Sequence, residues 1–137
     1  MNIIFGAKVL ARITNPEYGE GTNNNSSLQL EEMKNDRYTG KLGELTTRAE
    51  SGGEEDIDYI MSYLNNNSSL VMTKFVDFAL SLTVNPEGIA RIAYYLFNGT
   101  LIQRNYSSLF FNRRSDYDIV MRAYKEGMID EIQAFAR

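Results

Sequence analysis

The chain of 137 residues contains no cysteine, no histidine and no tryptophan. Without cysteine it can form no disulfide bond, no thiolate metal site and no thiol nucleophile. Without histidine it lacks the usual general base of hydrolases and the usual nitrogen ligand of zinc, copper and haem. These absences exclude most metalloenzymes and most hydrolases, so we expect a non-enzymatic protein that uses no metal and no cofactor. A small enzyme acting through paired carboxylates is the one catalytic hypothesis left open.

Long apolar runs are also absent. The apolar stretch Ile3–Ile13 is interrupted by Lys8 and Arg12, and it lacks the continuous apolar region of a signal peptide. No segment approaches the roughly 20 apolar residues that cross a bilayer. A hydrophobic share of 43% and a net charge of −4 are ordinary for a globular protein. We therefore expect one soluble, cytoplasmic domain over residues 1–137, with no membrane contact.

The composition of the chain changes near residue 54. Before it, Gly, Asn, Thr, Ser and Glu dominate; after it, apolar residues recur at helical spacing. Residues 15–27 are rich in Gly and Asn and predict a loop. Two neighbouring segments stay ambiguous: residues 8–13 fit a strand or a helix end, and 28–45 fit a hairpin turning near Asn35-Asp36 or a short helix. The predicted fold is mainly α, with a compact bundle of five to six short helices over about 54–137. A loop-rich N-terminal part, 1–53, precedes it and leaves a small β-hairpin open.

Cap signals divide the second part into helices. Asn85 is a suitable N-cap, and Pro86 suits the first helical position because its missing N–H is not needed there. Asn98-Gly99 predicts a left-handed C-cap, Thr100 can start the next helix, and Ser115–Asp118 has the spacing of a capping box. The apolar stripes of these helices predict a core that includes Leu82, Ile89, Ile92, Leu96, Ile102, Leu109 and Phe110.

The predicted helix from residue 54 carries the first candidate binding surface. Tyr59 and Tyr63 are one turn apart, and the acidic residues Glu54, Glu55 and Asp58 lie beside them. Tyrosines are common at protein interfaces, whereas carboxylates repel nucleic acid, so this combination favours a protein partner. The alternative is that the helix is buried on two sides and that the two hydroxyls reach water at its edge.

The second candidate surface lies in residues 99–114, which contain arginines and aromatic residues but no acidic residue. Arg104, Arg113 and Arg114 could contact phosphates, and aromatic rings can stack on bases. Helical geometry places Phe111 on a polar face, above Arg104 and Ser107, where an exposed ring would suit a binding site. The alternative is that the helix ends early and Phe111 turns into the core.

In general character the chain is small, mildly acidic, rich in Asn and Tyr, and devoid of His and Cys. In this it resembles the accessory proteins of phages and mobile elements, which include inhibitors of host nucleases and other defence systems. The resemblance implies a non-enzymatic interaction protein that binds and inhibits a larger host complex. The alternative is a nucleic-acid or nucleotide-binding module that uses the arginines and aromatic residues of the C-terminal helices. A homo-oligomer is left open.

Overall fold

The computed structural model describes residues 38–137, and within it Gly40–Arg137 form one packed unit. The described residues contain no strand; they form seven helices: α2 (Gly40–Ser51), α3 (Glu54–Met61), α4 (Leu70–Ser81), α5 (Pro86–Asn98), α6 (Leu101–Arg113), α7 (Tyr117–Lys125) and α8 (Glu131–Ala134). The mainly α prediction is therefore confirmed for this part of the chain. The segments expected at 8–13 and 15–27, and most of the hairpin alternative at 28–45, lie outside the described residues. No helix over 38–137 is both long enough and apolar enough to cross a membrane.

The predicted boundary at residue 54 is wrong, because the helices begin at Gly40. Residues 40–51 contain two glycines and several Thr and Ser residues, so their intrinsic helix propensity is low. Leu45 and Ala49, one turn apart, are nevertheless fully buried, and α2 packs against α3 and α4. Tertiary packing of this small apolar stripe therefore stabilises a helix that local propensity does not favour.

Several helix starts form as their cap residues predict. The side chain of Asn85 accepts a hydrogen bond from the Glu87 N–H at 2.9 Å, with Pro86 in the first turn of α5. Thr100 and Gln103 form a capping box at the start of α6. These bonds satisfy backbone N–H groups that have no partner within the helix.

Two predicted caps are wrong. Gly99 has an extended backbone, φ −80° and ψ −179°, so α5 does not end in a left-handed C-cap. Ser115 does not cap α7 either: the N-cap is Asp116, its side chain makes no capping bond, and Ser115 itself has φ +65°. In both places the next helix begins only a few residues later. The connecting residues therefore adopt the backbone angles that lead into that helix and not those of the preferred cap.

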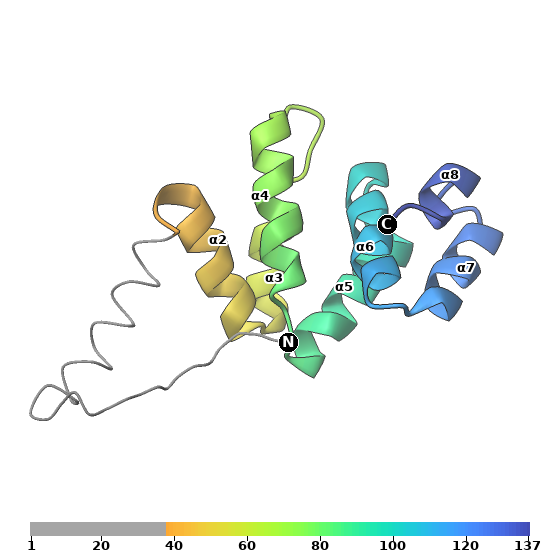
Figure 1. Cartoon of the computed structure of the whole chain (residues 1–137), viewed down its shortest axis with the longest axis horizontal. Coiled ribbons are helices and arrows are strands. Elements are labelled where there is room, and N and C mark those ends of the chain that lie inside the picture. Colours follow the sequence, from red (N-terminus) through yellow and green to blue (C-terminus); the bar gives the residue numbers. More distant parts are fainter. Residues whose placement is uncertain (1–37) are drawn as a thin grey trace, which may run out of the picture. The chain divides into compact units, whose positions relative to one another are not determined.

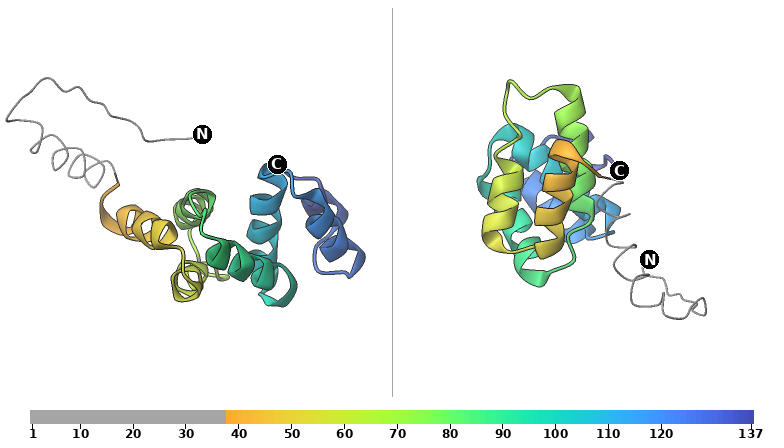
Figure 2. Two further views of the ribbon diagram at one scale, coloured as in Figure 1. Left: turned by 90° about the horizontal axis from the view of Figure 1, so that it is seen from below. Right: turned by 90° about the vertical axis from the view of Figure 1, so that its left-hand side faces the viewer.

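The helices follow one another from α2 to α8, with α5 and α6 between the two ends (Figures 1 and 2). Helix α3 packs against α2, α4 and α5, and α6 packs against α4, α5, α7 and α8. Helix α3 therefore contacts three other helices, and α6 is enclosed on several sides.

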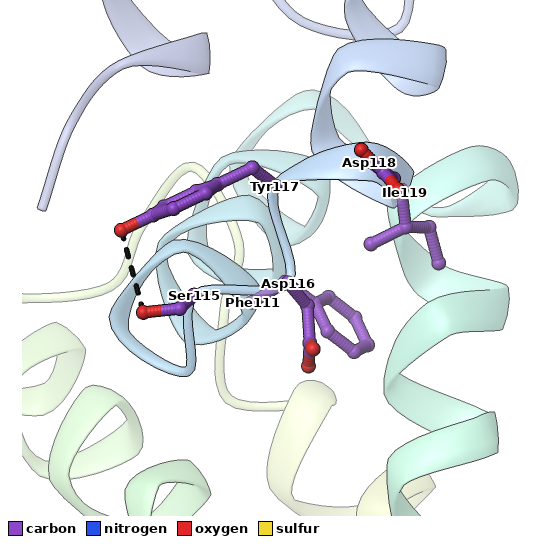
Figure 3. Close-up of a pocket in the computed structure, with 6 residues that line it drawn as sticks. All are labelled: Phe111, Ser115, Asp116, Tyr117, Asp118 and Ile119. Carbon is purple, nitrogen blue, oxygen red and sulfur yellow. Dashed lines mark hydrogen bonds between the residues drawn. The ribbon is translucent and has the colours of Figure 1, made fainter.

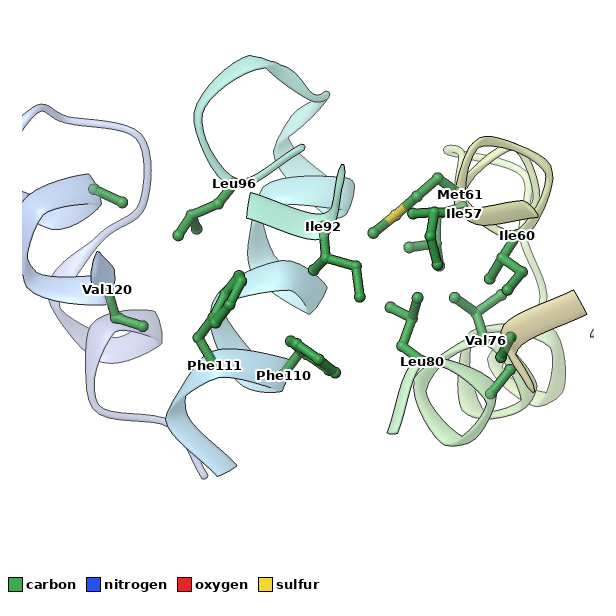
Figure 4. Close-up of a cluster of buried hydrophobic side chains, with 14 of the residues drawn as sticks. Ile57, Ile60, Met61, Val76, Leu80, Ile92, Leu96, Phe110, Phe111 and Val120 are labelled. Atoms are coloured by element: carbon green, nitrogen blue, oxygen red, sulfur yellow. The ribbon is translucent and has the colours of Figure 1, made fainter. Parts of the chain in front are cut away.

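A continuous apolar cluster connects these helices (Figure 4). Of the predicted core residues, Ile92, Leu96 and Phe110 are buried, whereas Leu82, Ile89, Ile102 and Leu109 are only half-buried. The main difference lies in α6, whose predicted polar face is buried instead: Ser107 and Ser108 are 0% exposed and Asn112 is 2% exposed. The hypothesis of an exposed Phe111 is wrong, because its ring is only 3% exposed and lies beside that of Phe110, with 5.0 Å between centroids. The alternative is confirmed in placing Phe111 in the core, but not in its reason: α6 does not end early, and Phe111 lies within a helix that continues to Arg113.

Replacing Phe111 by Ala should lower the free energy of unfolding by about 3–5 kcal/mol, since it leaves a cavity the size of a ring. Phe135 is 55% exposed, and Phe135→Ala is the matched control, with an expected change within about 0.5 kcal/mol. Denaturant unfolding of both variants measures the difference. Equal stabilities of the two variants would contradict the buried position of Phe111.

Candidate protein-interaction surface

One outer face of α2, α3 and α5 combines carboxylates, tyrosines and a few basic residues. Helix α3 buries Ile57, Ile60 and Met61, so its remaining positions lie beside the neighbouring helices or in solvent. We call this surface the acidic-tyrosine face; it comprises Lys41, Glu44, Arg48, Glu54, Glu55, Asp56, Asp58, Tyr59, Tyr63, Arg91, Tyr94 and Tyr95.

Between α2 and α3 this face is held by a hydrogen-bond network around Lys41. The Lys41 ammonium donates to Glu44 Oε1 and to the Tyr63 hydroxyl, both at 2.6 Å. The Tyr59 hydroxyl donates to the Glu44 carboxylate and lies 3.1 Å from the Tyr63 hydroxyl. The two tyrosine rings meet edge to face, 5.4 Å between centroids, and the Arg48 guanidinium lies over the Tyr59 ring at 4.2 Å. Both rings thus have defined orientations at the surface.

The network changes the proton affinity of its members in opposite directions. The hydrogen bond to Glu44 and that to Tyr63 raise the pKa of Lys41. The Lys41 ammonium in turn lowers the pKa of Glu44 and the pKa of Tyr63. The Glu44 carboxylate, as acceptor, favours the neutral phenol of Tyr59 and raises its pKa to about 12. At neutral pH Lys41 and Glu44 are therefore both charged, and Tyr59 is a neutral donor.

Between α3 and α5 the same face is held by Arg91. Its Nε donates to Asp58 Oδ1 at 2.8 Å, and its Nη1 lies 3.1 Å from a Glu54 carboxylate oxygen. The Tyr95 hydroxyl also donates to Asp58, at 2.8 Å, and the Arg91 guanidinium lies over the Tyr94 ring at 4.2 Å. Burial disfavours the charged form of Asp58, but the bonds from Arg91 and Tyr95 outweigh it and lower its pKa. Burial, together with Asp58, raises the pKa of Tyr95 to about 12.

At the start of α3 the face borders a hollow of about 440 Å³. It is lined by Gly53, Glu54, Glu55, Asp56 and Glu87, without a basic side chain. Asp56 is held by Arg48, whose Nε lies 2.8 Å from Asp56 Oδ1, and Glu55 is exposed. Over the described residues, no three acidic side chains are grouped as a metal site would require. The chemistry of this hollow suits an organic cation such as a lysine or arginine side chain.

The sequence prediction located only part of this surface. Glu54, Glu55, Asp58, Tyr59 and Tyr63 all lie on it, but both tyrosines are half-buried with their hydroxyls at the edge, as the alternative interpretation expected. The α2 residues were missed because residues 40–51 were not predicted to be a helix. The signal was present: Lys41, Glu44 and Arg48 are spaced i, i+3 and i+7, with alternating charge.

The second predicted surface is not assembled. Phe111 is buried, and Arg104 donates to two backbone carbonyls, from Nε to Met128 at 2.6 Å and from Nη1 to Gly99 at 2.8 Å. Arg104 therefore joins the start of α6 to the segment after α7. Arg113 and Arg114 remain exposed and form ion pairs, Arg113 with the half-buried Asp77 and Arg114 with the exposed Asp116.

A second hollow, of about 410 Å³, lies at the turn between α6 and α7 (Figure 3). Its polar wall includes Asp116, Asp118 and Ser115, whose hydroxyl accepts a hydrogen bond from Tyr117 at 3.3 Å. Phe111 and Ile119 form the apolar wall. It is shallow and separate from the acidic-tyrosine face, since it belongs to other helices.

In comparisons with family models, curated proteins and solved structures, the chain matches none of them significantly. The candidate surface therefore rests on the geometry and chemistry described above.

The two tyrosines of the Lys41 network should ionise in separate steps. Tyr63 should lose its proton below the ordinary pKa of about 10, and Tyr59 near pH 12. Ultraviolet titration of Tyr59→Phe and Tyr63→Phe assigns each step. Lys41→Met should raise the pKa of Tyr63, because the ammonium that favours the phenolate is removed. An unchanged titration in Lys41→Met would show that Lys41 does not contact Tyr63 in solution.

The raised pKa values of Tyr59 and Tyr95 also have a consequence for stability. Both groups stay protonated in the folded chain at pH values where the unfolded chain ionises. Their contribution is complete below pH about 10 and is lost as the pH rises toward 12. Stability should therefore fall in this window, and less steeply in Tyr95→Phe than in the unaltered protein; equally steep curves would contradict the raised pKa of Tyr95.

Arg104 should contribute to stability, in contrast to the exposed Arg114. Arg104→Met keeps the apolar stem but removes the donors to two carbonyls, so the free energy of unfolding should fall by about 1–3 kcal/mol. Arg114→Met removes an exposed ion pair and a guanidinium 5.5 Å from the Phe110 ring centroid, and it should cost less than about 1 kcal/mol. Thermal and denaturant unfolding provide the comparison, and an Arg104→Met variant as stable as Arg114→Met would speak against the two carbonyl bonds.

Proposed function

We propose that the protein is a non-enzymatic interaction protein that binds a basic surface of a larger protein through its acidic-tyrosine face. The observation that carries the proposal is the pre-formed network of Lys41, Glu44, Tyr59 and Tyr63, continued by Asp58, Arg91 and Tyr95 on the other side of α3. Side chains already held in place lose little conformational entropy on binding, and tyrosines then add contact area and hydroxyl groups.

The charge of the face supports a basic partner. Its carboxylates outnumber its basic groups. All the charged side chains that line the hollow at the start of α3 are carboxylates. Acidic patches meet basic patches in complexes, where they accelerate association and select partners. Basic surfaces of this kind are common on proteins that handle nucleic acids, because they bind phosphates.

This charge pattern also supports the inhibitory role suggested by the resemblance to phage and mobile-element accessory proteins. A small acidic protein seated on the nucleic-acid-binding surface of a host complex would exclude the nucleic acid by competition and by like charge. The alternative, a nucleic-acid-binding module, has less support, because Phe111 is buried and Arg104 is occupied by backbone carbonyls.

Affinity capture from a bacterial lysate treated with nuclease tests this proposal. Captured proteins should be basic and should elute with increasing salt. A double variant of the face, Glu55→Lys with Tyr94→Ala, should lower the affinity for them by about tenfold or more, as expected when more than 1 kcal/mol is lost at an interface.

The matched control carries the same types of substitution on α8, Glu131→Lys with Phe135→Ala. It should bind like the unaltered protein, and both double variants should keep their melting temperature, since all four side chains are exposed. If the face variant captures the same proteins as strongly as the control, the proposed surface is wrong. Loss of capture in the control alone would move the interface to α8.

A further inference from the structure

A small cavity lies between the end of α4, the connection to α5 and the end of α6. Its volume is about 190 Å³, and its polar lining consists of Asp77, Ser81, Thr83, Arg113 and Arg114. Val84 and Phe110 complete the wall. The cavity has no residue in common with the acidic-tyrosine face.

Thr83 is the unusual member of this lining. The residue is 1% exposed, and within the described residues its Oγ1 has no hydrogen-bond partner. Buried hydroxyls nearly always form a hydrogen bond, because leaving one unpaired costs its lost hydration. The neighbouring Ser81 differs, since its hydroxyl donates to the Phe78 carbonyl. Because Thr83 lines the cavity, we take a ligand bound there as the candidate acceptor for this unpaired donor.

Two guanidinium groups lie at the same cavity. Arg113 Nη1 donates to both carboxylate oxygens of Asp77, each at 2.8 Å, and this pairing orients the guanidinium through one of its three nitrogens. Arg114 donates from Nε to Asp116, which does not line the cavity, and its guanidinium lies 5.5 Å from the Phe110 ring centroid. The lining thus has two guanidinium groups, each paired with one carboxylate, and only Asp77 of these two carboxylates lines the cavity itself.

We propose that this cavity binds a small oxyanion, either a phosphate group or a carboxylate. Thr83 Oγ1 donates to one oxygen, and the remaining N–H groups of Arg113 and Arg114 donate to the others. Guanidinium groups present paired donors that match the geometry of carboxylate and phosphate. The limited volume and the apolar wall of Val84 and Phe110 restrict the site to the anionic group itself, with the rest of a larger ligand outside.

Thermal unfolding of the full chain in phosphate, at ionic strength held constant with sodium chloride, tests this inference. The melting temperature should rise with phosphate and saturate, because a ligand that binds only the folded chain stabilises it. Thr83→Val keeps the shape of the side chain and removes the donor. Without phosphate its melting temperature should equal or exceed that of the unaltered protein, and its apparent phosphate affinity should be about tenfold lower.

Arg114→Gln provides an independent variant at an exposed position, where folding is not at risk, and it should weaken phosphate binding to a similar extent. Arg122→Gln on α7, away from the cavity, is the matched control and should bind like the unaltered protein. The same unfolding measurement with acetate and with adenosine monophosphate distinguishes a carboxylate ligand from a phosphate ligand. Saturation by acetate identifies a carboxylate site, and stronger binding of the nucleotide than of phosphate identifies a phosphate ester.

No saturable response to phosphate, acetate or the nucleotide would overturn the proposal. So would equal responses in Arg114→Gln and Arg122→Gln. A marked loss of stability in ligand-free Thr83→Val would show that the hydroxyl already has a partner in the protein, which also contradicts the site. None of these outcomes bears on the acidic-tyrosine face, which is tested by its own variants.

Discussion

Helix α6 has to bury side chains on most of its circumference, because α4, α5, α7 and α8 all pack against it. It has too few apolar residues for this, and it buries Ser107, Ser108 and Asn112 as well. Small serines let neighbouring backbones approach closely. Asn112 is accommodated because its amide donates to the carbonyls of Ala134 and Ala136, at 2.9 and 2.8 Å. This buried amide joins the C-terminal segment to the centre of the fold.

The enclosure of α6 also determines which residues remain available for binding. On an isolated helix, Phe111 and Arg104 would suit a nucleic-acid site. In this fold Phe111 packs in the core, and Arg104 donates to two backbone carbonyls and so joins two segments. Helix α3 differs, since it packs against α2, α4 and α5 but leaves Glu55, and Ser62 at its C-cap, in solvent. Its polar residues therefore form networks with α2 and α5 while still reaching the surface. A binding role is accordingly better supported on α3 than on α6.

Helix α2 illustrates how a weak local signal depends on its surroundings. Its two glycines and its Thr and Ser residues resemble a loop, and only Leu45 and Ala49 are apolar and fully buried. Gly52 then adopts φ +65°, and a Cβ there would lie 2.8 Å from Asn85 Cβ, so the turn into α3 requires glycine for both conformation and space. Packing against α4, rather than intrinsic propensity, explains why the helix forms. The close turn into α3 places the two helices side by side, so that Lys41 reaches Tyr63.

The sequence by itself determined the helical class from residue 54 onward, the starts of α5 and α6, and the placement of Tyr59 and Tyr63 beside carboxylates. These features depend on residues three or four positions apart, whose interactions are the same in any helix. Only the tertiary structure decided which side of α6 is buried, that residues 40–51 are helical, and which partners the arginines take. Where a helix has polar residues on several sides, the energy of burial depends on neighbours distant in sequence, such as Met128 for Arg104 and Ala134 for Asn112. The periodicity of a single helix contains no information about those neighbours.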